Sequence, residues 1–75
     1  MGRFHLTFPA DLVEEPVIHA LGQRFGLVTN ITRAHVEEGG GWVILELKGP
    51  EEAVQEGVRW LTGRGVQVER IGDGG

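Results

Sequence analysis

Three histidines and three glutamate pairs are the side chains best suited to chemistry in this chain. His5, His19 and His35 fall on a predicted strand, a predicted helix and a second predicted strand, and no two of them are four residues apart. A helical zinc site needs two histidines at that spacing, with a carboxylate close by. The sequence therefore predicts no metal site.

The glutamate pairs could supply two carboxylates for acid and base catalysis, but their positions have a simpler explanation. One pair lies beside a predicted turn, and two lie at predicted helix starts, where negative charge is favourable at the positive end of the helix dipole. The pairs are Glu14-Glu15, Glu37-Glu38 and Glu51-Glu52. Serine and cysteine, the commonest nucleophiles, are absent from the sequence. We expect no enzyme activity and no cofactor.

Size and charge limit the chain to one small acidic domain. Its 75 residues allow a single core, which we place over residues 1–71, with a flexible tail over 72–75. The formal charge of -4 argues against nucleic-acid binding, which needs a clustered basic face. No apolar run approaches the roughly 20 residues that span a bilayer, and the N-terminus lacks a signal-peptide core. We expect a cytoplasmic protein without membrane insertion.

The strongest structural pattern is the alternation over residues 41–49, which lies between two glycines. Val43, Leu45 and Leu47 share one parity and predict a fully apolar strand face. The other face is only half apolar and carries Trp42, Ile44, Glu46 and Lys48. An antiparallel sheet with helices on one face and the other face open fits this asymmetry.

Other elements can be placed around this strand. Strands are predicted over residues 3–8, 27–37 and 66–71, with a glycine-rich turn over 38–41. Helices are predicted to begin at Pro16 and Pro50. The first should stop at Gly26, and the second over residues 63–65. The strand over 27–37 is irregular, because Ile31 lies on one parity while Ala34 and Val36 lie on the other. A bulge near Arg33 or a loosely sorted edge strand would explain this.

The predicted order is β-α-β-β-α-β. Two βαβ halves with right-handed crossovers make an α+β, ferredoxin-like fold, in which a four-stranded antiparallel sheet carries both helices on one face. The strands over 3–8 and 41–49 would be central, and the other two would lie at the edges. This fold hosts enzymes, RNA binders and sensors alike, so it does not name a function.

Six short segments between residues 3 and 71 carry a family resemblance. They are Leu6-Thr7-Phe8, Glu15-Pro16-Val17-Ile18, Arg24-Phe25-Gly26, Asn30-Ile31, Leu45-Glu46-Leu47-Lys48-Gly49 and Gly65-Val66-Gln67-Val68-Glu69. Together they resemble the NIL domain, which is named after an Asn-Ile-Leu stretch and is the C-terminal regulatory domain of methionine ABC importer ATPases. The resemblance implies a ferredoxin-like regulatory domain that forms a homodimer, binds an amino acid, methionine for preference, and has a transporter as its partner.

The chain departs from the NIL pattern in two respects. Thr32 stands where the family has leucine, and the connection from Glu37 to Gly41 is shorter than in many relatives. No P-loop sequence of the form Gly-x-x-x-x-Gly-Lys-Ser/Thr is present. We expect a free-standing copy of the domain or a piece of a larger protein.

Carried over by position, Asn30 is the predicted ligand contact. Its amide has two donors and one acceptor, which suit the carboxylate or ammonium of an amino acid at a sheet edge; the alternative is an asparagine that bonds its own backbone at a turn or bulge. Val36 and Val43 flank the hairpin where relatives place ligand-facing apolar side chains, and plain packing is the alternative for both. Ile31 is expected in the core.

Trp42 and Ile44 would leave an apolar patch on the open face of the sheet, which predicts a protein interface and most simply self-association. RNA binding is the natural alternative for this topology, but it needs several stacking aromatics on the open face, and only Trp42 is present. Two hypotheses remain: a dimeric module that binds an amino acid, and an interaction module without a small ligand.

Overall fold

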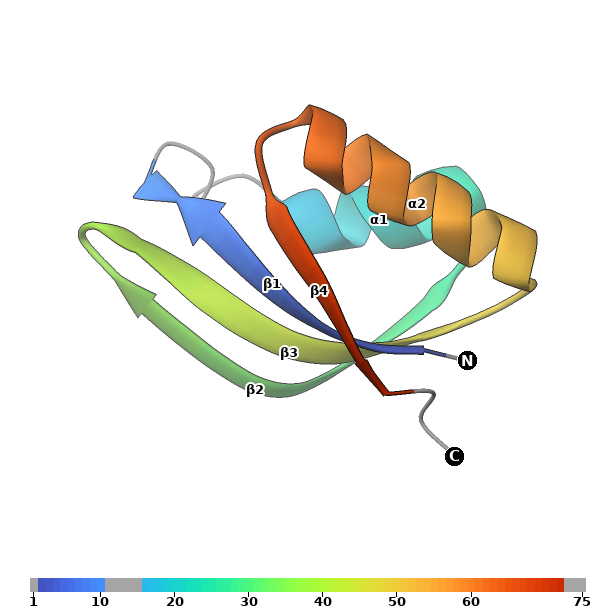
Figure 1. Ribbon diagram of the computed structural model, residues 1–75, viewed down its shortest axis with the longest axis horizontal. Coiled ribbons are helices and arrows are strands. Elements are labelled where there is room, and N and C mark those ends of the chain that lie inside the picture. Colours follow the sequence, from blue (N-terminus) through green and yellow to red (C-terminus); the bar gives the residue numbers. More distant parts are fainter. Residues whose placement is uncertain (1, 11–15, 73–75) are drawn as a thin grey trace.

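The chain folds as four strands and two helices in the predicted order. The computed structural model describes residues 2–10 and 16–72. The elements are β1 (Gly2–Pro9), α1 (Val17–Phe25), β2 (Val28–Glu37), β3 (Gly40–Lys48), α2 (Glu51–Gly63) and β4 (Gln67–Gly72). Figure 1 shows both helices on the same side of a twisted sheet. The α+β, ferredoxin-like prediction is therefore confirmed.

The sheet has the strand order β2-β3-β1-β4, and each neighbouring pair is antiparallel. The two central strands are β1 and β3, in a register that places Leu6 opposite Val43 and Phe4 opposite Leu45. Facing residues of an antiparallel pair project to the same side of the sheet. The register therefore combines the apolar parities of the two central strands into one continuous face.

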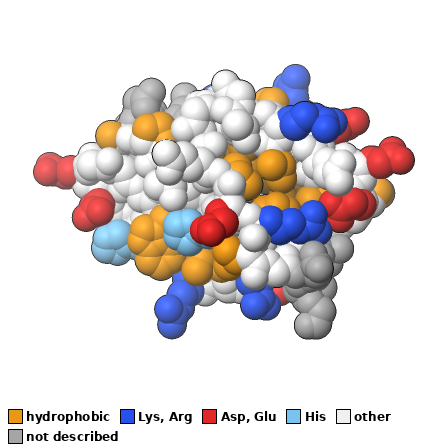
Figure 2. Space-filling view, viewed as in Figure 1, with side chains coloured by type: hydrophobic (Ala, Val, Ile, Leu, Met, Phe, Trp, Pro, Cys, Tyr) orange, Lys and Arg blue, Asp and Glu red, His pale blue; other side chains and the backbone are white. Residues whose placement is uncertain are grey.

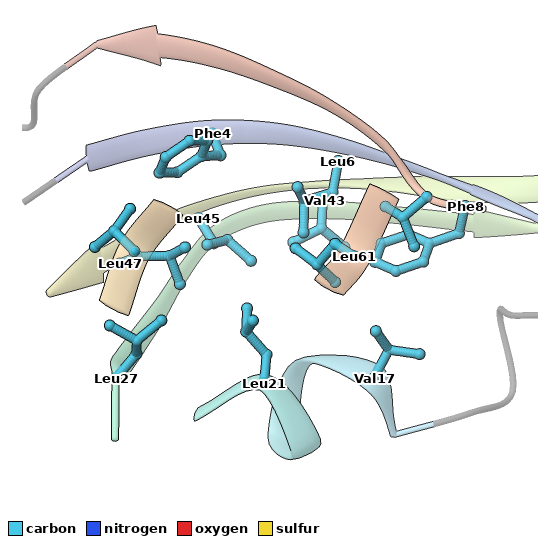
Figure 3. Packing of buried hydrophobic residues seen from close by; sticks show 12 residues of the cluster. Phe4, Leu6, Phe8, Val17, Leu21, Leu27, Val43, Leu45, Leu47 and Leu61 are labelled. Carbon is cyan, nitrogen blue, oxygen red and sulfur yellow. The ribbon is translucent and has the colours of Figure 1, made fainter. Parts of the chain in front are cut away.

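The core lies between this face and the helices (Figure 3). β1 buries every second residue, and β3 does so from Val43 to Leu47, as the period of a strand requires. Two leucines from the helices, Leu21 of α1 and Leu61 of α2, are fully buried against them. The buried hydrophobic residues are Phe4, Leu6, Phe8, Val17, Leu21, Leu27, Val43, Leu45, Leu47, Val54, Leu61 and Val66.

Close packing of the two helices depends on Gly57 of α2, which is buried. A Cβ atom at this position would lie 2.9 Å from Leu21 Cδ1 and 3.3 Å from Leu27 Cδ1. Glycine is unfavourable in a helix interior by roughly 0.5–1 kcal/mol relative to alanine. Here the missing side chain lets α2 approach α1 and Leu27, the residue before β2.

Both helices begin one residue later than the proline signal predicts. Pro16 and Pro50 occupy the residue before the first turn, and the helices start at Val17 and Glu51. Glu51 and Glu52 lie in the first turn of α2, as expected for acids near the helix dipole. The pair Glu14-Glu15 lies outside the described residues.

The irregularity of β2 is a bulge, one of the two explanations that the sequence left open. Pairing with β3 passes from Ile31 opposite Leu45 to Arg33 opposite Ile44, so Thr32 is the extra residue. The Thr32 hydroxyl donates a hydrogen bond of 3.0 Å to the Ile44 carbonyl oxygen. The bulge reverses the parity of the strand, so that Ile31 and Ala34 both face the helix side. β4 at the other edge continues to Gly72, and residues 73–75 lie outside the described chain.

Candidate functional site

The face of the sheet without helices, which we call the open face, carries a row of aromatic rings. Trp42 of β3 lies between His5 of β1 and His35 of β2, with ring centroids 5.6 Å and 6.1 Å away and ring planes inclined by 20° and 24°. In Figure 2, hydrophobic side chains gather beside histidine and acidic side chains in this region. Trp42 and Ile44 are both half-buried. The predicted interface residues therefore form one surface, partly shielded by their neighbours.

Asn30 also projects to the open face, because it is paired with Glu46 across the β2–β3 ladder. Its Nδ2 donates a hydrogen bond of 3.4 Å to Glu46 Oε1, and Arg3 Nη2 donates one of 3.1 Å to Glu46 Oε2. The Glu46 side chain is only 15% exposed. The Asn30 amide is thus held by a side chain across the ladder, and its carbonyl oxygen points to no partner among the hydrogen bonds of the described residues.

These hydrogen bonds from Arg3 and Asn30 hold the pKa of Glu46 below its ordinary value. Because the pKa is lower in the folded state, the ionised Glu46 carboxylate stabilises the fold. This contribution is complete above the unfolded-state pKa of about 4.3, and it is lost as the pH falls through the folded-state pKa. The pKa of Glu51 is lowered in the same way, by its hydrogen bonds with Arg70. Acid should therefore destabilise the domain.

We expect Glu46→Gln to weaken this acid dependence. The melting temperature of the wild type should fall as the pH drops below about 4.3, and the variant, which has no carboxylate at position 46 to protonate, should lose less over the same range. Thermal unfolding followed by circular dichroism at a series of pH values measures this. Glu56→Gln, an exposed position on α2, is the matched control and should follow the wild type. Equal pH profiles for all three proteins would contradict the expectation.

β2 is the exposed edge of the sheet, and most of its side chains are solvent-accessible. Val28, Ile31 and Val36 are 62%, 51% and 64% exposed. Ile31 was expected in the core, and that prediction is wrong: its parity is correct, but the two helices leave its side chain uncovered. An edge strand with exposed apolar residues offers unpaired backbone groups and an apolar contact to a binding partner.

The three predicted ligand contacts do not lie on one face. Asn30 projects to the open face, whereas Val36 and Val43 belong to the helix side, given their pairing with Gly41 and Ala34. Val43 is 7% exposed and is part of the core. Only Asn30 and Val36, on opposite faces of the β2 edge, are accessible. The sequence did not reveal the link between Arg3 and Glu46, because these residues are 43 positions apart.

The three histidines lie on different elements, His5 on β1, His19 on α1 and His35 on β2. Over residues 2–10 and 16–72, no group of three or more His, Cys, Asp or Glu side chains could hold a metal ion. Neither helix of this part of the chain is long and apolar enough to cross a membrane.

Comparison with known families decides the classification. Residues 3–70 match the NIL domain over nearly the whole chain. The chain belongs to the NIL domain family. Asn30 lies within the matched residues, and so does the bulge residue Thr32, two positions further along β2. The hydroxyl of Thr32 donates the hydrogen bond to the Ile44 carbonyl oxygen described above.

Similar proteins have names that refer to methionine import. The NIL domain is 28% identical over 71 residues to methionine import ATP-binding protein MetN 1 of Salmonella choleraesuis, covering 89% of this chain and 21% of that protein. It is 30% identical over 74 residues to methionine import ATP-binding protein MetN 2 of Acinetobacter baylyi, covering 93% of this chain and 22% of that protein. The chain thus spans about a fifth of these relatives.

A solved structure has the same fold. It is the C-terminal domain of an ABC transporter/ATP-binding protein from Enterococcus faecalis, with a TM-score of 0.83 and 21% identity. The match covers 96% of this chain and 84% of that one.

Proposed function

We propose that this NIL domain is a non-catalytic regulatory module that binds an amino acid, methionine for preference, and pairs with a second copy of itself. The observation that carries the proposal is the family match over residues 3–70, together with relatives whose names refer to methionine import. By analogy with those relatives, the module would act in the cytoplasm on a transporter ATPase. Calorimetry with L-methionine tests the ligand, and sedimentation tests the pairing.

The ligand would bind at the edge formed by β2. The Asn30 side-chain carbonyl could accept a hydrogen bond from the ammonium group, and backbone N–H groups on the outer side of the edge strand could donate to the carboxylate. Val28 is exposed and projects to the same face as Asn30, so it offers an apolar contact. Val36 would contribute from the helix side of the same edge, and Val43 would support it from the core.

The pairing surface would be the β2 edge and the adjoining part of the open face. The exposed Val28, Ile31 and Val36 all lie on this strand, and Trp42 and Ile44 continue the apolar surface onto β3. A second copy would cover these side chains and complete the backbone hydrogen bonds of the edge strand. The ligand site would then lie at or near the interface between the two copies.

We expect Ile44→Glu to convert the pair to monomers, because the substitution places a charge in the apolar surface that the second copy would cover. Sedimentation equilibrium measures the change in mass. Gln23→Glu adds the same charge on the exposed side of α1 and should leave the pair intact. A wild type that stays monomeric at high concentration, or a variant that pairs as the wild type does, would contradict the proposed surface. Circular dichroism checks that both variants remain folded.

The same exposed edge also favours a second candidate, an interaction module that docks on another protein and binds no small ligand. Exposed apolar residues on β2 would serve that contact equally well. In this case Ile44→Glu should disrupt docking, and Asn30→Ala should have little effect.

A further inference from the structure

A groove lies between α2 and β4, at the opposite edge of the sheet from β2. Its volume is about 360 Å³, and it is lined by Phe4, Val54, Gln55, Val58, Arg59, Val68 and Arg70. Cavities of roughly 300–1,000 Å³ suit small-molecule ligands. In Figure 2, hydrophobic side chains are visible between these two elements, with Lys or Arg side chains beside them. The groove exists because α2 covers the centre of the sheet and leaves part of the helix side of β4 uncovered.

The floor and walls of the groove are apolar and well fixed. Phe4 is 2% exposed and Val54 is fully buried, so both belong to the core. Val58 and Val68 are half-buried and pack against that core from the two sides of the groove. Val54 and Val58 are four residues apart on α2, which corresponds to about 6 Å along the helix axis. This length suits a short alkyl chain.

The two cations of the groove differ in their surroundings. Arg70 donates hydrogen bonds of 2.8 Å and 3.1 Å to the two carboxylate oxygens of Glu51, and its guanidinium lies 5.3 Å from the centroid of the Phe4 ring. Its charge is therefore offset at one end of the groove. Arg59, one turn beyond Gln55 on α2, makes no salt bridge with the acidic residues of the described chain. The lining contains two guanidinium groups and no carboxylate.

We propose that this groove binds a small aliphatic carboxylate. The alkyl chain would lie over Val58 and Val68, and the carboxylate would accept hydrogen bonds from Arg59, the form of recognition for which a guanidinium is suited. An α-amino acid fits less well, since no acidic residue lines the groove to pair with its ammonium group. This site is separate from the amino-acid site proposed at the β2 edge, and neither requires the other.

Titration of the ¹⁵N-labelled chain with hexanoate, followed by NMR, tests the proposal. We expect saturable shifts with a millimolar dissociation constant, largest for the backbone amides of Val54 to Arg59 and Val68 to Arg70. Hexylamine, which has the same chain and the opposite charge, should produce no saturable shifts there. Three outcomes would overturn the proposal: shifts that do not saturate, shifts that centre on another surface, or the same shifts with hexylamine.

Variants separate the role of the charge from general electrostatic attraction. Arg59→Gln should bind hexanoate about tenfold more weakly, as expected for the loss of one charge-assisted hydrogen bond. Arg33→Gln removes the same charge from the exposed β2 strand and should bind as the wild type does. Equal affinity of the two variants would overturn the assignment of Arg59. Methionine binding at the β2 edge should be unchanged in Arg59→Gln, so failure of this proposal leaves the proposed function standing.

Discussion

Leu45→Ala is expected to lower the free energy of unfolding by about 2–5 kcal/mol. Leu45 is fully buried on β3, at the centre of the face covered by the helices. The substitution removes apolar contacts and leaves a cavity that neighbouring residues fill only in part. A chain of 75 residues has a total stability of about 4–11 kcal/mol. The loss is therefore a large share of the total.

Chemical denaturation followed by circular dichroism measures this effect. In thermal unfolding, the melting temperature should fall by about 4–8 °C for each kcal/mol of stability lost. Val28→Ala also shortens an apolar side chain, but on the exposed edge strand, and should change stability by less than about 1 kcal/mol. If the two variants had the same stability, Leu45 would not occupy the centre of the core.

Gly40→Ala is expected to destabilise the hairpin end of the sheet strongly. Gly40 has a φ angle of 131°, and a Cβ atom there would lie 2.5 Å from the Phe8 carbonyl oxygen. The unfavourable φ costs about 1–3 kcal/mol. The collision involves backbone atoms, which cannot turn aside as a flexible side chain can. To remove this collision, the paired ends of β1 and β3 must separate. The total loss in the free energy of unfolding should therefore exceed the cost of the φ angle alone.

The neighbouring glycine provides a matched control. Gly39 has no atom within 4 Å of a Cβ built on it, and its φ is not positive. Gly39→Ala should leave stability unchanged or raise it by about 0.4–1 kcal/mol, because alanine restricts the unfolded chain. Denaturation curves for the two variants test the difference. Equal stability would contradict the close approach of Gly40 to β1.

The fold could be predicted from the sequence because its central elements carry strong periodic signals. Residues 41–49 alternate so clearly that the buried face of β3 followed from Val43, Leu45 and Leu47 alone. The conflicting parity around Ile31 indicated either a bulge or a loosely sorted edge strand, and the structure shows a bulge at Thr32. The proline signals were less exact, because Pro16 and Pro50 serve as well before the first turn as within it.

The exposure of β2 could not be predicted, because it depends on how far the helices extend over the sheet. Ile31 has the parity of a core residue and yet is 51% exposed. The same limit applies to the candidate sites. The relative positions of Asn30, Glu46 and Arg3 depend on the register of three strands, and the groove depends on where α2 lies relative to β4. Neither arrangement leaves a local signal in the sequence.

Calorimetric titration of the chain with L-methionine tests the proposed function most directly. We expect saturable binding in the micromolar to sub-millimolar range, strongly weakened in Asn30→Ala and retained in Gln23→Ala, an exposed polar position on α1. At about 100 times the dissociation constant, methionine should stabilise the fold by roughly 2.7 kcal/mol, which a melting experiment on so small a domain detects readily. A flat titration with methionine and with the other amino acids, in a folded chain, would contradict the account of an amino-acid sensor.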